Sequence, residues 1–230
     1  MSAQEKEYGF LRANALSLAF GALFFVTLVG QAISGAADFN AQQIANGLEP
    51  VSLSEYVTSS SFGVDVMENW QSEYLQFFLY IFATVWLLQH GSSESKKPGE
   101  EGRESDKEQK IGRHADEDSP EWARTGGWRT ALFSRSLGLL MGALFLLTWA
   151  ASYIAGRAAY NSEQLANRED PVSWLGYAGE ADFWNRSFQN WQSEMLAVGS
   201  MAVFSIYLRQ RGSPESKLVG AGHHDTGQTG

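Results

Sequence analysis

Four long apolar segments limit what this chain of 230 residues can fold into. An α-helix needs about 20 mostly apolar residues to cross the hydrocarbon core of a bilayer. The segments span residues 15–37, 70 to about 89, about 134 to 155, and 191–208. The last is the shortest, and it reaches a plausible length only when it is counted from Trp191. The sequence therefore predicts an all-α, polytopic membrane protein with four transmembrane helices.

The second half of the sequence repeats the first at an offset of 121 residues. The shared motifs are GALF at 21–24 and 142–145, PVS at 50–52 and 171–173, NWQSE at 69–73 and 190–194, and GSSESK at 91–96 with GSPESK at 212–217. So many matches at one offset indicate a duplicated unit. Each unit holds two spans, so both units should have the same orientation. This predicts two parallel two-helix repeats related by a pseudo-twofold axis along the membrane normal.

The first apolar segment also fits a cleaved signal peptide, with small residues near 34–36 as the cleavage site. A close copy of the segment lies in mid-chain, where no signal peptidase substrate is expected. That copy favours a retained span.

The distribution of basic residues predicts the orientation of the chain. Residues 36–69 contain no Lys or Arg, and residues 156–190 contain only Arg157, Arg168 and Arg186. The stretch 91–131 holds eight Lys and Arg residues, and more follow the last span. We therefore expect a multi-pass protein of the cytoplasmic (inner) membrane, with both termini and the linker in the cytoplasm and the two loops outside.

We expect five parts along the chain. They are a cytoplasmic N-terminus (1–12), a first two-span repeat (13–96), a charged cytoplasmic linker (97–131), a second two-span repeat (132–217) and a cytoplasmic tail (218–230). The linker and tail have few apolar residues to bury, so we expect them to be disordered. Trp122 and Trp128, near the end of the linker, are expected to seat the third span at the cytoplasmic interface.

The two outer loops carry helix signals. Asn40 and Asn161 are each followed three residues later by Gln, which is the pattern of a capping box, so a helix is expected to start at each Asn. Gly47 should end the first of these helices. Ser52 and Glu55 form a second capping-box pattern, which the other copy lacks. Small helical outer loops are therefore predicted.

The repeated pentapeptide NWQSE forms the candidate polar site. Its residues are Asn69, Trp70, Gln71 and Glu73 in the first copy, and Asn190, Trp191, Gln192 and Glu194 in the second. Tryptophan is typical of the membrane interface. A carboxylate that faces lipid is costly, so the two glutamates should point into the bundle or a wet cavity.

Three interpretations of Glu73 and Glu194 compete. The first is structural: each carboxylate stabilises a helix N-terminus and bonds to the loop or to the neighbouring repeat. The second makes the pair a site for a proton, a cation or a cationic solute. The third is acid–base catalysis by paired carboxylates, but no nucleophile, metal cluster or phosphate loop accompanies them.

Small residues recur on the first and third spans. Ser17 and Gly21 correspond to Gly138 and Gly142, and each pair fits the small-xxx-small pattern of close helix packing.

Composition excludes several classes of site. The chain has no Cys, which excludes disulfides and thiolate metal sites, and its net charge of −9 argues against a nucleic-acid partner. The four His residues lack the paired positions that haem ligation between spans would need. No catalytic residue, cofactor or metal is predicted. The expected partners are the lipid bilayer and a possible second copy of the chain; any small-molecule or ion ligand is left open.

The NWQSE lead-in, the span that follows it and the GS-x-ESK exit together resemble a family of bacterial four-span membrane proteins with no assigned function. The second copy, with QNWQSE and YLRQRGSPESK, is the closer match, while the first departs at LLQHGSSESK. The resemblance covers both repeats but not the linker, and it implies a bacterial cytoplasmic-membrane protein. It implies no catalytic residues.

The leading functional expectation is a non-enzymatic envelope or membrane-organising protein whose outer loops form a small helical cap. The alternative is a small transporter or channel component that uses Glu73 and Glu194.

Overall fold

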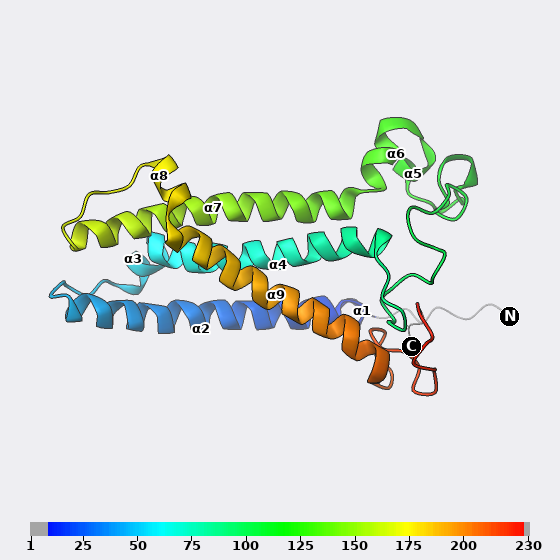
Figure 1. Ribbon diagram of the computed structural model, residues 1–230, viewed down its shortest axis with the longest axis horizontal. Helices are drawn as coiled ribbons and strands as arrows, with labels where there is room; N and C mark the ends of the chain where they lie inside the picture. Colours follow the sequence, from blue (N-terminus) through cyan, green and yellow to red (C-terminus); the bar gives the residue numbers. More distant parts are fainter. Residues whose placement is uncertain (1–8, 228–230) are drawn as a thin grey trace. The chain divides into compact units, whose positions relative to one another are not determined.

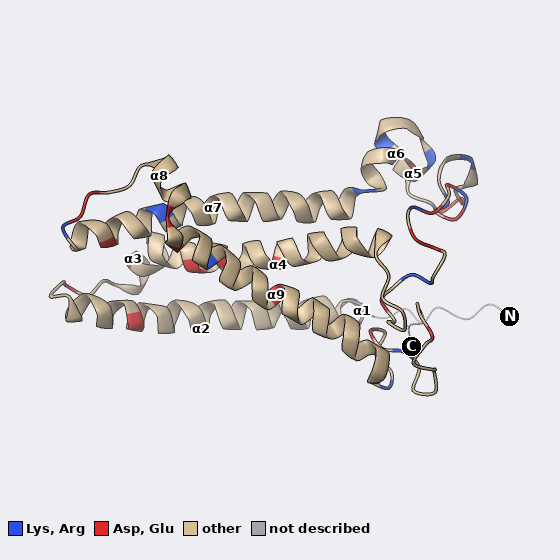
Figure 2. Ribbon diagram, viewed as in Figure 1, with Lys and Arg blue, Asp and Glu red and all other residues tan. Residues whose placement is uncertain are grey.

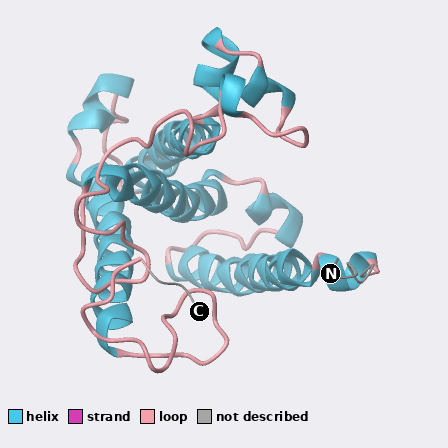
Figure 3. Ribbon diagram, turned by 90° about the vertical axis from the view of Figure 1, so that its right-hand side faces the viewer, coloured by secondary structure: helices cyan, strands magenta, loops and turns pink. Residues whose placement is uncertain are grey.

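The computed structural model describes residues 9–227, and over that range it contains helices, turns and loops but no strand (Figure 3). The all-α fold class is therefore confirmed. The elements in chain order are α1 (Phe10–Ala13), α2 (Ala15–Ala45), α3 (Leu53–Val57), α4 (Ser60–Trp86), η1 (Gly112–His114), α5 (Glu121–Arg124), α6 (Gly127–Phe133), α7 (Ser136–Ala166), α8 (Trp174–Gly179) and α9 (Ala181–Tyr207) (Figure 1).

The chain forms two compact units, and the boundary between them lies inside α4. The first unit, up to Gly63, contains α2, α3 and the first turn of α4. The second, from Val64, contains the rest of α4, the linker and everything after it. The candidate polar site lies wholly in the second unit.

Helices α2 and α7 are long and apolar enough to cross a membrane. Figure 2 shows few charged residues along either helix. Their apolar stretches carry exposed side chains such as Phe25 and Leu147, which are 65% and 67% exposed. A soluble protein rarely exposes so much continuous apolar surface. Helices α4 and α9 are 27 residues long but carry more polar residues, and they do not reach the same apolar standard.

The bounds of the long helices recur at the offset of 121 seen in the sequence. Helices α2 and α7 both have 31 residues, and α4 and α9 both have 27. In each pair, the second helix begins and ends 121 residues after the first. The two connecting segments, residues 46–59 and 167–180, correspond in the same way, and we call them the hairpin loops.

Helix α2 ends where the sequence predicts. Asn46 is its C-cap, and Gly47 has a φ of 73°, the left-handed conformation that glycine adopts without strain. At the equivalent place after α7, Arg168 adopts a φ of 62°. The turn is therefore kept even where the sequence no longer supplies the glycine.

Helices α4 and α7 pack antiparallel. A side chain added at Gly142 would meet the ring of Phe78 at 3.1 Å, and one at Gly138 would lie 3.8 Å from Ile81. Val64 lies beside Gly156 in the same register. Gly138 and Gly142 thus lie where α4 approaches α7. In the first unit, Gly21 and the exposed Ser17 belong to α2, and Gly21 has nothing within 4 Å.

The linker and the described part of the tail contain short helices and hydrogen-bonded turns. The linker contains η1 and α5, and it leads into α6, where the Trp122 and Trp128 rings lie 6.0 Å apart. The described part of the tail turns back, and the Gly227 amide donates to the Ser92 carbonyl. Lys217, just before the tail, is buried, whereas Trp122 and Trp128 of the linker are exposed. Residues 1–8 and 228–230 of the predicted termini lie outside the described range.

Candidate functional site at the contact of α4 and α9

The hairpin loops are fastened to the preceding helix by asparagine. The Asn40 side chain accepts from the Val51 amide and donates to the Val51 carbonyl, both at 2.8 Å. Asn161 makes the same two bonds with Val172, at 2.8 and 3.1 Å. The prediction that these asparagines start helices is wrong, because α2 and α7 run through both positions. Their side chains instead satisfy loop backbone groups 11 residues away.

A buried tyrosine completes each hairpin loop. Tyr56 and Tyr177 are 3% and 1% exposed, and each hydroxyl lies against a glycine of the preceding helix, Gly35 or Gly156. No larger residue would leave room for the ring at either glycine. The Ser52–Glu55 capping box is formed as predicted, and Ser173 caps α8 alone. These contacts hold each hairpin loop against its preceding helix just before α4 or α9 begins.

A charged cluster lies just after that point, between α4 and α9. The Arg186 guanidinium contacts Asp182 at 3.1 Å, Glu68 at 3.2 Å and Asp65 at 3.9 Å. The Tyr177 hydroxyl donates to Asp182 at 3.0 Å. We call Asp65, Glu68, Asp182 and Arg186 the charged cluster. One guanidinium is shared among three carboxylates, so the cluster carries excess negative charge.

Burial sets the protonation behaviour of the cluster. It raises the pKa of Asp65 and of Glu68, and the nearby Arg186 offsets only part of the rise. The pKa of the Tyr177 hydroxyl is also raised, first by burial and then by the Asp182 charge. All three groups therefore favour their neutral forms more than they would in water.

One turn further along, the first pentapeptide meets the second. Gln71 is 1% exposed, and its Oε1 accepts a hydrogen bond from Trp191 Nε1 at 2.8 Å. Within residues 9–227, the Gln71 Nε2 atom is buried without a hydrogen-bond partner. The Trp191 ring also contacts Trp149 and Phe145 of α7 at centroid distances of 5.9 and 6.3 Å. The site is thus a three-helix contact among α4, α7 and α9.

Of the remaining residues of the candidate polar site, some bond within their own helix and others lie near the opposite helix. The side chains of Asn69 and Asn190 donate to carbonyls four residues earlier on their own helices, Asp65 and Arg186. Gln192 is exposed and Trp70 is half-buried. Glu73 of α4 and Glu194 of α9 lie within electrostatic range of each other. The structure therefore brings together Gln71 with Trp191, and Glu73 with Glu194.

The pentapeptide lies deeper along α7 than its position in the sequence indicates. Trp191 packs beside Trp149, which precedes Arg157, the first charged residue of α7, by eight residues. At about 1.5 Å per residue, that places the contact about 12 Å inside the apolar stretch of α7. Glu194 follows Trp191 by a further turn.

The two GS-x-ESK motifs, which we call the exit loops, fold alike. Ser95 and Ser216 each accept a hydrogen bond from the amide six residues earlier, at 2.9 Å in both. Gly91 and Gly212 have φ values of 85° and 83°. Lys217 is 1% exposed, and its ammonium donates to the carbonyls of Gly91, Gly222, His223 and Asp225. The motif is thus a self-capped turn closed by a lysine.

A family model described as Domain of unknown function (DUF6766) matches residues 7–228. The chain belongs to this family. No curated protein and no solved structure matches the sequence. The match agrees with the resemblance to a family without an assigned function, and it includes the linker as well as both pentapeptides and both exit loops.

Sequence reasoning missed the charged cluster of this DUF6766 domain. A signal was present, because Asp65 and Glu68 are three apart and Asp182 and Arg186 are four apart, which places each pair on one helix face. Asp65 and Arg186 also occupy equivalent positions with opposite charge. That combination predicts an ion pair if equivalent positions of α4 and α9 oppose each other.

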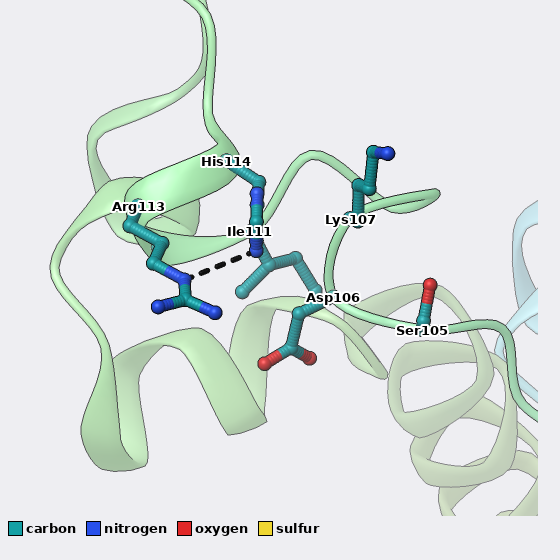
Figure 4. Close-up of a pocket in the computed structure, with 7 residues that line it drawn as sticks. Ser105, Asp106, Lys107, Ile111, Arg113 and His114 are labelled. Atoms are coloured by element: carbon teal, nitrogen blue, oxygen red, sulfur yellow. Dashed lines mark hydrogen bonds between the residues drawn. The ribbon is translucent and has the colours of Figure 1, made fainter.

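The DUF6766 linker holds a shallow depression away from the pentapeptides (Figure 4). It is lined by Ser105, Asp106, Lys107, Ile111, Gly112, Arg113 and His114. Arg113 Nε donates to His114 Nε2 at 3.2 Å, as the dashed line in Figure 4 marks. The lining comes from neighbouring residues of one loop, and this arrangement brings no distant groups together.

Proposed function

We propose that this chain is a four-span protein of the bacterial cytoplasmic membrane, built from two parallel two-helix repeats, with a structural role in organising the membrane or envelope. Helices α2 and α7 contain the first and third spans, α4 contains the second from Trp70, and α9 contains the fourth from Trp191. Both termini and the linker face the cytoplasm, where their basic residues favour retention. The hairpin loops lie on the outer face, and no chemistry is assigned to them.

The observation that carries the structural role is the repeated construction of the hairpin loops. Asn40 and Asn161 each hold a loop valine by both backbone groups, and Tyr56 and Tyr177 each fill the space above a glycine. A loop fastened at two points loses the freedom that a gate needs. These features support two rigid caps that present a fixed surface.

The pairing of α4 with α9 supports the parallel repeat. Asp65 and Arg186 are equivalent positions that form an ion pair, and Glu73 and Glu194 are equivalent positions whose charges interact. Equivalent positions oppose each other when a twofold axis passes between two helices. The duplicated unit would therefore assemble around the α4–α9 contact.

The alternative is a proton or cation pathway through Glu73 and Glu194. Two carboxylates that repel each other beside an apolar stretch favour uptake of one proton or of a cation. The Gln71 Nε2 atom, which is buried without a partner among residues 9–227, belongs to α4 two positions before Glu73. This observation gives the transport hypothesis its specific support.

Purified protein in liposomes separates the two functions. A pH-sensitive dye inside the liposomes and an imposed potassium gradient report proton or cation flux. The structural role predicts the same flux as in empty liposomes, and the Glu73→Gln/Glu194→Gln variant should unfold at a changed temperature. A flux that the wild-type chain supports and this variant loses, with thermal unfolding unchanged, would overturn the structural role.

A matched control removes the same amount of charge at two glutamates other than Glu73 and Glu194. The Glu100→Gln/Glu101→Gln variant removes two exposed carboxylates from the linker. It should leave both flux and unfolding temperature unchanged. Loss of flux in this control as well would mean that net charge, rather than the Glu73 and Glu194 pair, determines the signal.

A further inference from the structure

The segment before α7 combines exposed apolar and basic side chains in a short helical hairpin. Helices α5 and α6 lie at the N-terminal end of α7 (Figure 1), and only Ser134 and Arg135 separate α6 from it. The apolar side chains Trp122, Trp128, Leu132 and Phe133 are 38%, 68%, 42% and 41% exposed. We call residues 121–135 the pre-span hairpin.

Side-chain contacts hold the hairpin in one shape. The Trp122 and Trp128 rings meet edge to face at 6.0 Å. The Thr130 hydroxyl donates to the Trp122 carbonyl at 2.5 Å, which ties α6 to α5. The hairpin therefore presents its two tryptophans together instead of as separate flexible side chains.

Three arginines flank this apolar surface. Arg124, Arg129 and Arg135 are exposed, and in the described part of the chain none of them forms an ion pair with a carboxylate. The Arg129 guanidinium lies over the Trp128 ring at 5.7 Å. Glu121 is the single acidic residue from 121 to 135, so the hairpin carries a net charge of +2 within a chain of net charge −9. Its charge opposes that of the rest of the chain.

We propose that the pre-span hairpin binds anionic phospholipid headgroups at the membrane face where α7 begins. Tryptophan and leucine enter the interfacial region, and the arginines contact lipid phosphates from the side. The covalent link to α7 holds the hairpin at that depth. This proposal rests on the membrane-spanning role of α7.

The Cys-free chain allows a direct test with a single introduced cysteine. Ala131 is exposed on α6, and Ala131→Cys carries a nitroxide label in the otherwise wild-type full chain. Vesicles contain phosphatidylcholine alone or phosphatidylcholine mixed with phosphatidylglycerol. Collision of the label with oxygen or with a water-soluble nickel complex reports whether it lies in lipid or in water.

Phosphatidylglycerol should move the label toward oxygen and away from nickel, and high salt should reverse part of this shift. Each arginine should favour the bound state by about fivefold at low salt. In the Arg124→Gln/Arg129→Gln/Arg135→Gln variant the dependence on phosphatidylglycerol should vanish. Equal label depth in both lipid mixtures for the wild-type hairpin would overturn the proposal.

Two controls identify the cause. The Lys97→Gln/Arg103→Gln/Lys107→Gln variant removes the same charge from the linker and should retain the lipid dependence. If it loses the dependence equally, the hairpin is not the binding surface. A second label at Leu146→Cys in α7 tests insertion of the span itself. A water-exposed label there contradicts the membrane-spanning role, whereas a lipid-exposed label with an unresponsive hairpin contradicts only the headgroup proposal.

Discussion

The two exit loops share a backbone and differ in what their lysines contact. In the first, Lys96 donates to the Gly102 carbonyl at 2.6 Å and pairs with Glu104 at 2.5 Å, both in the linker. In the second, Lys217 turns into the molecule, where four carbonyl groups surround it. One of these belongs to Gly91 of the first exit loop. Motif and local backbone are therefore common to both copies, while the partner depends on the chain that follows.

The same contrast holds at the other end of the helices. The bonds from asparagine to a loop valine and the contacts of the buried tyrosines are the same in the two hairpin loops. Each of them joins groups that are close together in the sequence. Where α4 meets α9, the copies differ, with Asp65 opposite Arg186. The asparagine and tyrosine contacts within each helix pair thus agree, whereas equivalent positions of α4 and α9 carry different residues where these two helices meet.

The largest effect is expected where the copies agree. Gly156→Val and Gly35→Val should each destabilise by about 3 kcal/mol, because the added side chain collides with Tyr177 or Tyr56. Thermal unfolding in detergent measures both. Gly30→Val, in a helix position with nothing within 4 Å, is the matched control and should change little. A large effect at Gly156 alone would mean that the hairpin loops are not equivalent.

The exit-loop lysines should separate the copies. Lys217→Met leaves buried carbonyl groups without a donor and should cost about 2 kcal/mol. Lys96→Met removes a more exposed ion pair and should cost less than about 1 kcal/mol. Hydrogen exchange of residues 89–96 and 210–227 measures both effects locally. Equal protection in the two variants would contradict the difference in their surroundings.

Replacing Arg186 tests the contact between α4 and α9. Arg186→Gln leaves three carboxylates facing one another and should destabilise by about 1–2 kcal/mol, since the cluster is partly exposed. Adding Glu68→Gln to that variant should recover part of the loss. A double-mutant cycle on unfolding temperature gives the coupling. Additive effects would show that Arg186 and Glu68 do not interact.

The smallest effect concerns pH. Burial raises the pKa of Asp65 and Glu68 above their ordinary values of 3.8 and 4.5, so protonation favours the folded state. This contribution is complete below those ordinary values and is lost as pH rises through the raised pKa values. On mild acidification the free energy of unfolding should therefore rise by less than about 1 kcal/mol and the unfolding temperature should rise slightly with it. The Asp65→Asn/Glu68→Gln variant should reduce this rise. A fall in the unfolding temperature on mild acidification would contradict the raised pKa values of Asp65 and Glu68.

Local signals in the sequence were sufficient for several features. The Ser52–Glu55 capping box and the end of α2 at Gly47 follow from bonds between residues a few positions apart. The all-helical class follows from long apolar segments without strand alternation. Asn40 shows where such reasoning stops, because a capping pattern was present but α2 continued through it. Helix α2 keeps its backbone hydrogen bonds through Asn40, and the Asn40 side chain bonds to the Val51 backbone instead.

By itself, the sequence determined the helical class, the two strongly apolar helices and the offset at which helix bounds recur, since these depend on composition and spacing along the chain. Tertiary structure alone decided that Gln71 meets Trp191, that Arg186 serves three carboxylates and that Lys217 reaches Gly91. Apart from the Arg186–Asp182 pair, which lies within α9, each of these contacts joins residues more than 100 positions apart. The first two exist because helix packing fixes which faces of α4, α7 and α9 meet, and the third because the two exit loops meet beyond the ends of α4 and α9. No local propensity encodes either choice.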